Sequence, residues 1–170
     1  MGILGVKNLT VLRNKIDTTK MYKPFFLAIM VGGIMKTNLF KDKTIKTIER
    51  FILSTGTMRQ ILECEIQIKD EKAVVSNYEI RYIDNGAKRV LIEQGETSYK
   101  DILKLLNKYK VLSWDGFKGK HPKNVADGTV FTLEAVVNED RIIYATGSQN
   151  FPKDYHEVYK ALREIMQPVS

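Results

Sequence analysis

The chain has 170 residues, of which 44% are hydrophobic and 28% are charged, values typical of one folded domain and not of a disordered chain. A single cysteine, Cys64, excludes an internal disulfide framework, and two histidines provide no pattern of metal ligands. The formal net charge of +7 suggests an anionic partner only if the positive residues are concentrated in one region.

The positive charge is concentrated near the N-terminus. Residues 1–47 contain nine Lys and Arg against two Asp, whereas residues 48–170 contain eighteen basic and eighteen acidic residues and are neutral. We therefore predict a basic, apolar N-terminal segment over 1–47, as an appendage or an extra element, and one domain over 48–170. The lysines expected to attract an anionic membrane surface or nucleic acid are Lys15, Lys20, Lys23, Lys36, Lys41 and Lys43.

The most apolar stretch, PFFLAIMVGGIM at residues 24–35, belongs to this segment. It is shorter than the roughly 20 residues that a helix needs to cross a bilayer, and no signal-peptide cleavage pattern follows it. Its length favours a buried strand or short helix, with membrane contact through residues 21–36 as the alternative. A cytoplasmic location is expected, with membrane association as its alternative, and translation could begin at Met1, Met21 or Met35.

Strand patterns dominate from residue 46 onwards. Two strands are predicted on either side of residues 54–57, and the second has an apolar face formed by Leu62, Cys64, Ile66 and Ile68. Asn85-Gly86 is the strongest hairpin signal in the chain and joins two further strands. We predict a four-stranded antiparallel meander.

Helical spacing appears twice after the meander. One helix is predicted to follow the capping residue Ser98, and another to begin near Pro152 with an apolar stripe of Tyr155, Val158, Leu162 and Ile165. Between them, a second hairpin turns at residues 138–140. Because strands and helices do not strictly alternate, the fold class predicted is α+β, an antiparallel meander plus a second hairpin with two amphipathic helices packed on the sheet.

Three short motifs carry a resemblance to a known group. They are the corner Trp114, Gly116 and Phe117; the strand start Asp127-Gly128; and Gly147, Asn150, Phe151 and Pro152 before the last helix. The chain is similar in these motifs, over roughly residues 49 to 166, to a group of uncharacterised bacterial α+β proteins. The resemblance implies a shared fold and brings no activity with it.

The loops that carry these motifs flank the second hairpin and could meet at one end of the domain. There they would place aromatic surface, carboxylates and an amide around a cleft, as binding sites do. The candidate binding residues are Trp114, Asp115, Phe117, Lys118, Lys120, Lys123, Asp127, Asn150 and Phe151. Turn formation alone would also explain Asp127, Gly128 and Asn150.

No catalytic constellation is evident. His121 and His156 have no implied nucleophile, and MVGGIMK lacks the spacing of a P-loop. We therefore predict a non-enzymatic recognition or interaction module, with no catalytic residue, metal or cofactor, that binds a protein or a small ligand through the Trp114 and Phe151 loops. The alternative is binding of an anionic surface, either a membrane or nucleic acid, through the basic N-terminal segment.

Overall fold

The computed structural model describes residues 42–57, 59–83, 86–123, 125 and 127–167. The predictions for residues 1–41, including the segment 21–36 and Lys15, Lys20, Lys23, Lys36 and Lys41, lie outside the described residues. The elements in chain order are β1 (Ile48–Gly56), β2 (Ile61–Lys69), β3 (Lys72–Ile83), β4 (Gly86–Ser98), α1 (Tyr99–Lys108), a 3-10 turn η1 (Val111–Trp114), β5 (Lys118–Gly119), β6 (Val130–Val137), β7 (Arg141–Ser148) and α2 (Tyr155–Met166).

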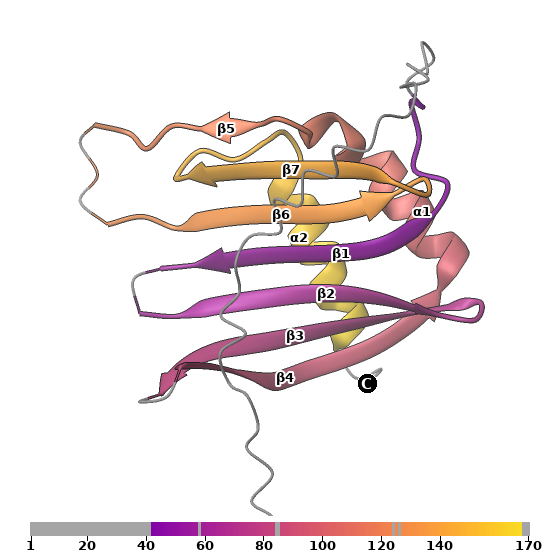
Figure 1. Ribbon diagram of the computed structural model, residues 1–170, viewed down its shortest axis with the longest axis horizontal. Helices are drawn as coiled ribbons and strands as arrows, with labels where there is room; N and C mark the ends of the chain where they lie inside the picture. Colours follow the sequence, from indigo (N-terminus) through magenta and orange to yellow (C-terminus); the bar gives the residue numbers. More distant parts are fainter. Residues whose placement is uncertain (1–41, 58, 84–85, 124, 126, 168–170) are drawn as a thin grey trace, which may run out of the picture. The chain divides into compact units, whose positions relative to one another are not determined.

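The strands form one seven-stranded sheet in the order β4-β3-β2-β1-β6-β7-β5 (Figure 1). All neighbouring strands are antiparallel except β5 and β7. The predicted meander is confirmed as β1 to β4, and the predicted second hairpin is confirmed as β6 and β7. Between β1 and β2, Leu53 pairs with Cys64 and both side chains are buried, so the predicted apolar face of β2 does face the core.

Both helices lie on one face of the sheet (Figure 1). Ser98 caps α1 as predicted, because its Oγ accepts a hydrogen bond of 3.1 Å from the backbone N–H of Asp101. Helix α2 begins at Tyr155 and not near Pro152, since Asp154 still has a left-handed backbone with φ +63°. Met166, not the predicted Ile165, completes its buried stripe, because Ile165 is only half-buried.

The core fills the space between the sheet and these helices. Phe51, Leu53 and Leu133 of the sheet are fully buried, as are Ile102 of α1 and Leu162 of α2. Burying one such side chain contributes about 1.5–3 kcal/mol, so the helices are held mainly by their apolar faces. The predicted α+β fold is confirmed, and the face of the sheet opposite α1 and α2 carries no helix among the described residues.

Residues 42–47 belong with this packed body, although the sequence prediction assigned them to the N-terminal segment. Ile45 is buried, and its backbone N–H donates to Oδ1 of Asn107 at 2.7 Å. Nδ2 of Asn107 donates in return to the Ile45 carbonyl oxygen at 2.8 Å. Oδ1 of Asn138 accepts from the backbone N–H groups of Lys46 and Thr47. The side chain of Lys43 is exposed.

Helices α1 and α2 contain 10 and 12 residues. Within the part of the chain that the structure describes, no helix combines the length and the apolar character that a bilayer-spanning helix requires.

Candidate functional site

The tryptophan of the predicted site is a core residue. Trp114 ends η1 and is only 2% exposed, and its Nε1–H donates to the carbonyl oxygen of Lys153 at 3.1 Å. The corner turns at Gly116, whose φ of +78° is readily adopted only by glycine. The prediction that Trp114 contacts a ligand is therefore wrong, because folding the chain back over α1 directs the indole into the core.

The two candidate phenylalanines also pack inward. Phe117 and Phe151 are half-buried on either side of the buried Phe131, with ring centroids 6.0 and 5.5 Å from it. Phe151 stacks on Tyr155 at 4.6 Å. Tilted and offset rings at these distances attract each other, so this cluster joins the β5 edge of the sheet to the start of α2. Only a part of each phenylalanine surface is left for a ligand.

Asp115 and Asn150 serve the backbone around them. Oδ1 of Asp115 accepts a hydrogen bond of 3.3 Å from the backbone N–H of Tyr144 in β7. The carbonyl oxygen of Asn150 occupies the position that a side-chain carbon at Gly119 or Gly147 would need. Both glycines are therefore required by close backbone packing, in which Asn150 takes part through its carbonyl oxygen.

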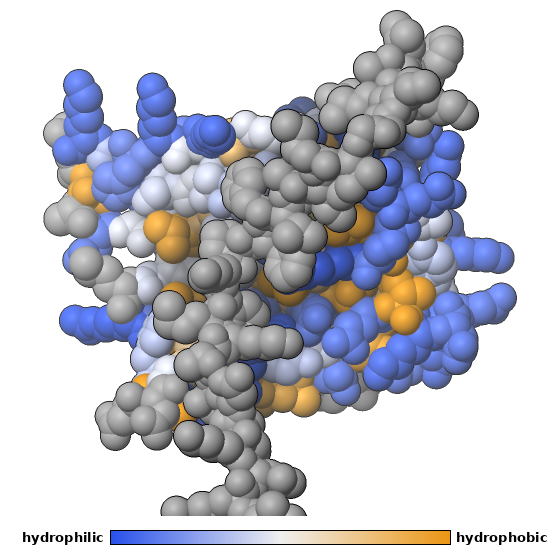
Figure 2. Space-filling view, in the orientation of Figure 1, coloured by the Kyte–Doolittle hydropathy of each residue, from blue (hydrophilic) through white to orange (hydrophobic). Residues whose placement is uncertain are grey.

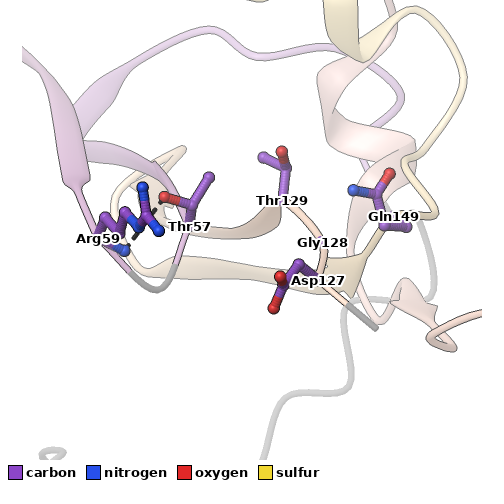
Figure 3. A pocket seen from close by; sticks show the side chains of 6 residues that line it. All are labelled: Thr57, Arg59, Asp127, Gly128, Thr129 and Gln149. Atoms are coloured by element: carbon purple, nitrogen blue, oxygen red, sulfur yellow. Dashed lines mark hydrogen bonds between the residues drawn. The ribbon is translucent and has the colours of Figure 1, made fainter. Parts of the chain in front are cut away.

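A recess lies at the end of the sheet where the β1–β2 turn meets the loops before β6 and after β7 (Figure 3). It has a volume of about 360 Å³. The two loops flanking the β6–β7 hairpin do meet there, since the backbone N–H of Gln149 donates to the Thr129 carbonyl at 2.9 Å. The residues that line the recess are Thr57, Arg59, Asp127, Gly128, Thr129 and Gln149.

Of these six residues, sequence reasoning proposed only Asp127 as a binding residue. Thr57 and Arg59 were missed because they belong to the β1–β2 turn, which is far from the other loops in sequence. Thr129 and Gln149 adjoin the predicted Asp127-Gly128 and Asn150 motifs, and that proximity was the one available signal. Figure 3 shows Arg59 beside Thr57 on one side of the recess and Gln149 on the other.

Three lysines lie in the segment that leads to this end of the sheet. Lys118, Lys120 and Lys123 are exposed, in β5 and the loop that follows it. Among the described residues, neither these lysines nor Arg59 has a carboxylate within 4.0 Å, and Asp127 has no basic group within that distance. In the described part of the chain, four basic residues without an ion pair thus accompany one such carboxylate.

His121 braces the lysine-bearing loop. Its Nε2 lies 2.6 Å from the carbonyl oxygen of Val125 and its Nδ1 lies 2.8 Å from Oγ of Ser148. A carbonyl oxygen can only accept, so Nε2 carries a proton in this arrangement. When the ring is neutral, Nδ1 accepts from the Ser148 hydroxyl. The histidine therefore ties the loop to the end of β7.

Strongly perturbed titratable groups lie elsewhere. Burial, with a smaller contribution from Glu93, raises the pKa of the Cys64 thiol to about 12. Burial also raises the pKa of Tyr155 to about 12. Both groups lie in the core, and neither lines the recess. Across the described ranges, no three His, Cys, Asp or Glu side chains gather as the ligands of a metal ion would.

In comparisons with known proteins, the sequence matches no family model, and neither a curated protein nor a solved structure proves similar to the chain.

Proposed function

We propose that this protein is a non-enzymatic recognition module that binds an acidic segment of a protein partner. The proposed contact surface, called here the cationic recess, consists of the six lining residues together with Lys118, Lys120 and Lys123. The supporting observation is the meeting of three sequence-distant loops at one open recess, with an excess of basic side chains that form no ion pair among the described residues. Trp114, Phe117 and Phe151 act beneath this surface as its support.

The form of the recess favours a protein segment over a small molecule. Small-ligand sites bury most of the ligand within largely apolar walls. The cationic recess is instead open to solvent, has the charged side chains of Arg59 and Asp127 in its lining, and its lysines extend from an exposed edge. Such charges attract an acidic partner over a distance and set its orientation, while each exposed ion pair adds little affinity. The expected complex is therefore weak and sensitive to salt.

Amide chemical-shift mapping tests the proposal. The full chain is titrated with a glutamate-rich peptide, and a glutamine-rich peptide of the same length is the control. We expect saturable shifts at Arg59, Gln149 and residues 118–129 with the acidic peptide alone, weakening as salt is added. Shifts spread over the whole surface, or equal shifts with both peptides, would contradict the proposal.

A matched pair of charge reversals locates the surface. Lys120 and Lys123 are both changed to Glu in one variant, and Lys69 and Lys100 are both changed to Glu in the other. All four lysines are exposed, and none forms an ion pair among the described residues. The first variant should lose peptide binding and the second should keep most of it. An equal loss in both would show that net charge alone attracts the peptide.

The basic N-terminal segment supports a second candidate function, the binding of an anionic surface. The excess of seven positive charges in residues 1–47 favours it. We propose that the full chain pellets with vesicles containing anionic phospholipid, and that a chain beginning at Met35 pellets less. Retention on immobilised DNA without vesicle binding would favour nucleic acid instead. Equal vesicle binding by the two chains would contradict a role for residues 1–34.

A further inference from the structure

A second, smaller hollow adjoins the cationic recess at the same end of the sheet, and its volume is about 140 Å³. Thr57 and Thr129 line both spaces, so the two are continuous. None of the residues that line the smaller space is charged, whereas Arg59 and Asp127 line the cationic recess. The smaller space, called here the apolar hollow, is lined by Thr55, Gly56, Thr57, Gln60, Leu62 and Thr129.

Leu62 supplies the hydrophobic surface of the apolar hollow. Its side chain is on the same face of β2 as those of the buried Cys64 and Ile66, because side chains two residues apart in a strand point the same way. Leu62 itself is only half-buried, and it is not one of the hydrophobic residues that pack against the core in the described part of the chain. Part of the Leu62 side chain is therefore left for a hydrophobic group of a ligand.

The neighbours of Leu62 leave space for such a group. Gly56 pairs with Ile61 between β1 and β2 and has no side chain to fill the hollow. Nε2 of Gln60 donates to Oε1 of Glu79 in β3 at 3.0 Å, which holds this amide at the β3 side. A cavity of about 150 Å³ lined by hydrophobic residues holds a benzene molecule. The apolar hollow is of similar size, so it has room for one aliphatic side chain.

Hydrophobic surface and positive charge follow each other along this end of the sheet. The strand order places β2 and β1 on one side of β6 and places β7 and β5 on the other. The apolar hollow borders β1 and β2, and the cationic recess reaches the loops before β6 and after β7. Lys118, Lys120 and Lys123 come last, in β5 and the loop after it. A segment lying across the strand ends would thus meet Leu62 first and the lysines afterwards.

We infer that the acidic segment bound by the cationic recess has a hydrophobic residue at one end, and that this residue packs on Leu62 in the apolar hollow. The inference rests on the proposed function and specifies the partner of the same surface. The four strand spacings from β2 to β5 amount to about 19 Å, the length of about six residues of extended chain. The partner sequence expected is one aliphatic residue with acidic residues over about the next five positions.

The two parts of this surface contribute differently to binding. Exposed ion pairs add little affinity, although they steer the partner and set its orientation. Burial of an aliphatic side chain adds affinity in proportion to the apolar area removed from water. Salt screens the first contribution and leaves the second nearly unchanged. The ratio between the affinities of two peptides that differ only in the hydrophobic residue should therefore persist as salt is added.

Four peptides titrated into the full chain test the inference by isothermal calorimetry. Two of them have a leucine before or after a run of six glutamates, and their controls have serine in the same place. Both orders are needed because the direction of the segment across the strand ends follows from the peptide that binds better. We expect one leucine peptide to bind at least about fivefold more tightly than its serine control.

A pair of variants locates the hydrophobic contact. Leu62→Thr should abolish the preference for leucine over serine and leave binding of the serine peptide unchanged. Leu91→Thr, at a strand leucine that is 51% exposed in β4, is the control and should keep the preference. Thermal unfolding checks that both variants fold. Chemical-shift mapping of the unaltered chain gives a second readout, since the amides of residues 55, 56 and 62 should shift with the leucine peptide and not with its control.

The possible results separate the inference from the proposed function. Equal binding of all four peptides would overturn the inference and leave the cationic recess as the site of an acidic segment. A failure of every peptide to bind would overturn both. A preference for leucine that survives in Leu62→Thr, or that leaves residues 55, 56 and 62 unshifted, would place the hydrophobic contact elsewhere and overturn the inference as well.

Discussion

The indole Nε1–H of Trp114 donates a hydrogen bond to the carbonyl oxygen of Lys153, 39 residues further along the chain and 3.1 Å away. The donor belongs to the corner after α1 and the acceptor to the turn before α2. The indole also lies 6.0 Å, between ring centroids, from Tyr155 at the start of α2. One side chain thus fixes two loops that border the cationic recess, which explains how a buried residue can shape a surface that it does not reach.

Replacement of Trp114 should therefore reduce stability. Trp114→Ala should lower the free energy of unfolding by about 3–5 kcal/mol, because it empties a core position and removes a buried hydrogen bond. Trp114→Phe should lower the free energy of unfolding by less, since an aromatic ring still fills part of the core position. Tyr82→Ala, at a side chain that is 73% exposed, is the control and should change stability by less than about 1 kcal/mol. Urea unfolding measures all three. A stable Trp114→Ala chain would contradict the core assignment.

Asn107 of α1 should hold residues 42–47 against that helix. Its side-chain amide both accepts from and donates to the backbone of Ile45, at 2.7 and 2.8 Å. Asn107→Ala removes both hydrogen bonds, so the backbone N–H and carbonyl groups of Ile45 must bond to water instead. The free energy of unfolding should fall by about 1–3 kcal/mol. Amide exchange near Ile45 should accelerate more than exchange in β2. The neighbouring Lys108→Ala is the control, and equal acceleration in both variants would argue against the anchor.

Alanine substitutions at two glycines should separate the effect of a steric clash from the effect of backbone strain. A Cβ at Gly95 would overlap the carbonyl oxygen of Ile165, so Gly95→Ala must displace β4 or α2. A Cβ at Gly116 would meet no atom within 4 Å, but φ is +78° there. Gly116→Ala should cost about 1–2 kcal/mol from backbone strain alone. We expect Gly95→Ala to lower the melting temperature more and to shift the amide signals of α2. Equal losses of melting temperature in the two variants would show that β4 and α2 separate easily.

The sheet was largely predictable because a strand half-buried on one face must alternate its side chains, and Leu62, Cys64, Ile66 and Ile68 show that alternation directly. The Asn85-Gly86 hairpin signal then predicts which strands are neighbours. The start of α2 was placed too early, because Pro152 can begin a helix but does not require one. The left-handed Asp154, a consequence of how the turn packs, delays the helix to Tyr155.

The candidate site was less predictable. Residue type does not reveal the direction of a ring at a corner, so the sequence favoured a structural role for Trp114 but left contact with a ligand open. Arg59 could not be assigned from sequence, because its proximity to Asp127 and Gln149 depends on the pairing of β1 with both β2 and β6. The meeting of the loops before β6 and after β7 was predictable, since antiparallel neighbours bring those ends together.

The Cys64 thiol gives a prediction for the dependence of stability on pH. Its pKa in the folded chain is about 12 against an ordinary value of 9.0, chiefly because burial disfavours the thiolate. Between these two pH values the unfolded chain loses the thiol proton and the folded chain keeps it. The folded chain then binds more protons, so the free energy of unfolding must fall as pH rises. Below pH 9.0 both states are protonated and this group contributes no slope.

Cys64→Ala should therefore make the stability curve less steep in this range, even though the cavity lowers stability at every pH. Tyr155, whose pKa also rises from 10.0 to about 12, should leave a residual slope above pH 10.0. Urea unfolding at pH values from 8 upwards measures the difference between the two chains. Labelling of the folded chain by a thiol reagent supplies a second measurement, because a buried neutral thiol reacts only when the core opens. Parallel stability curves, together with rapid labelling of the folded chain, would show that Cys64 reaches solvent.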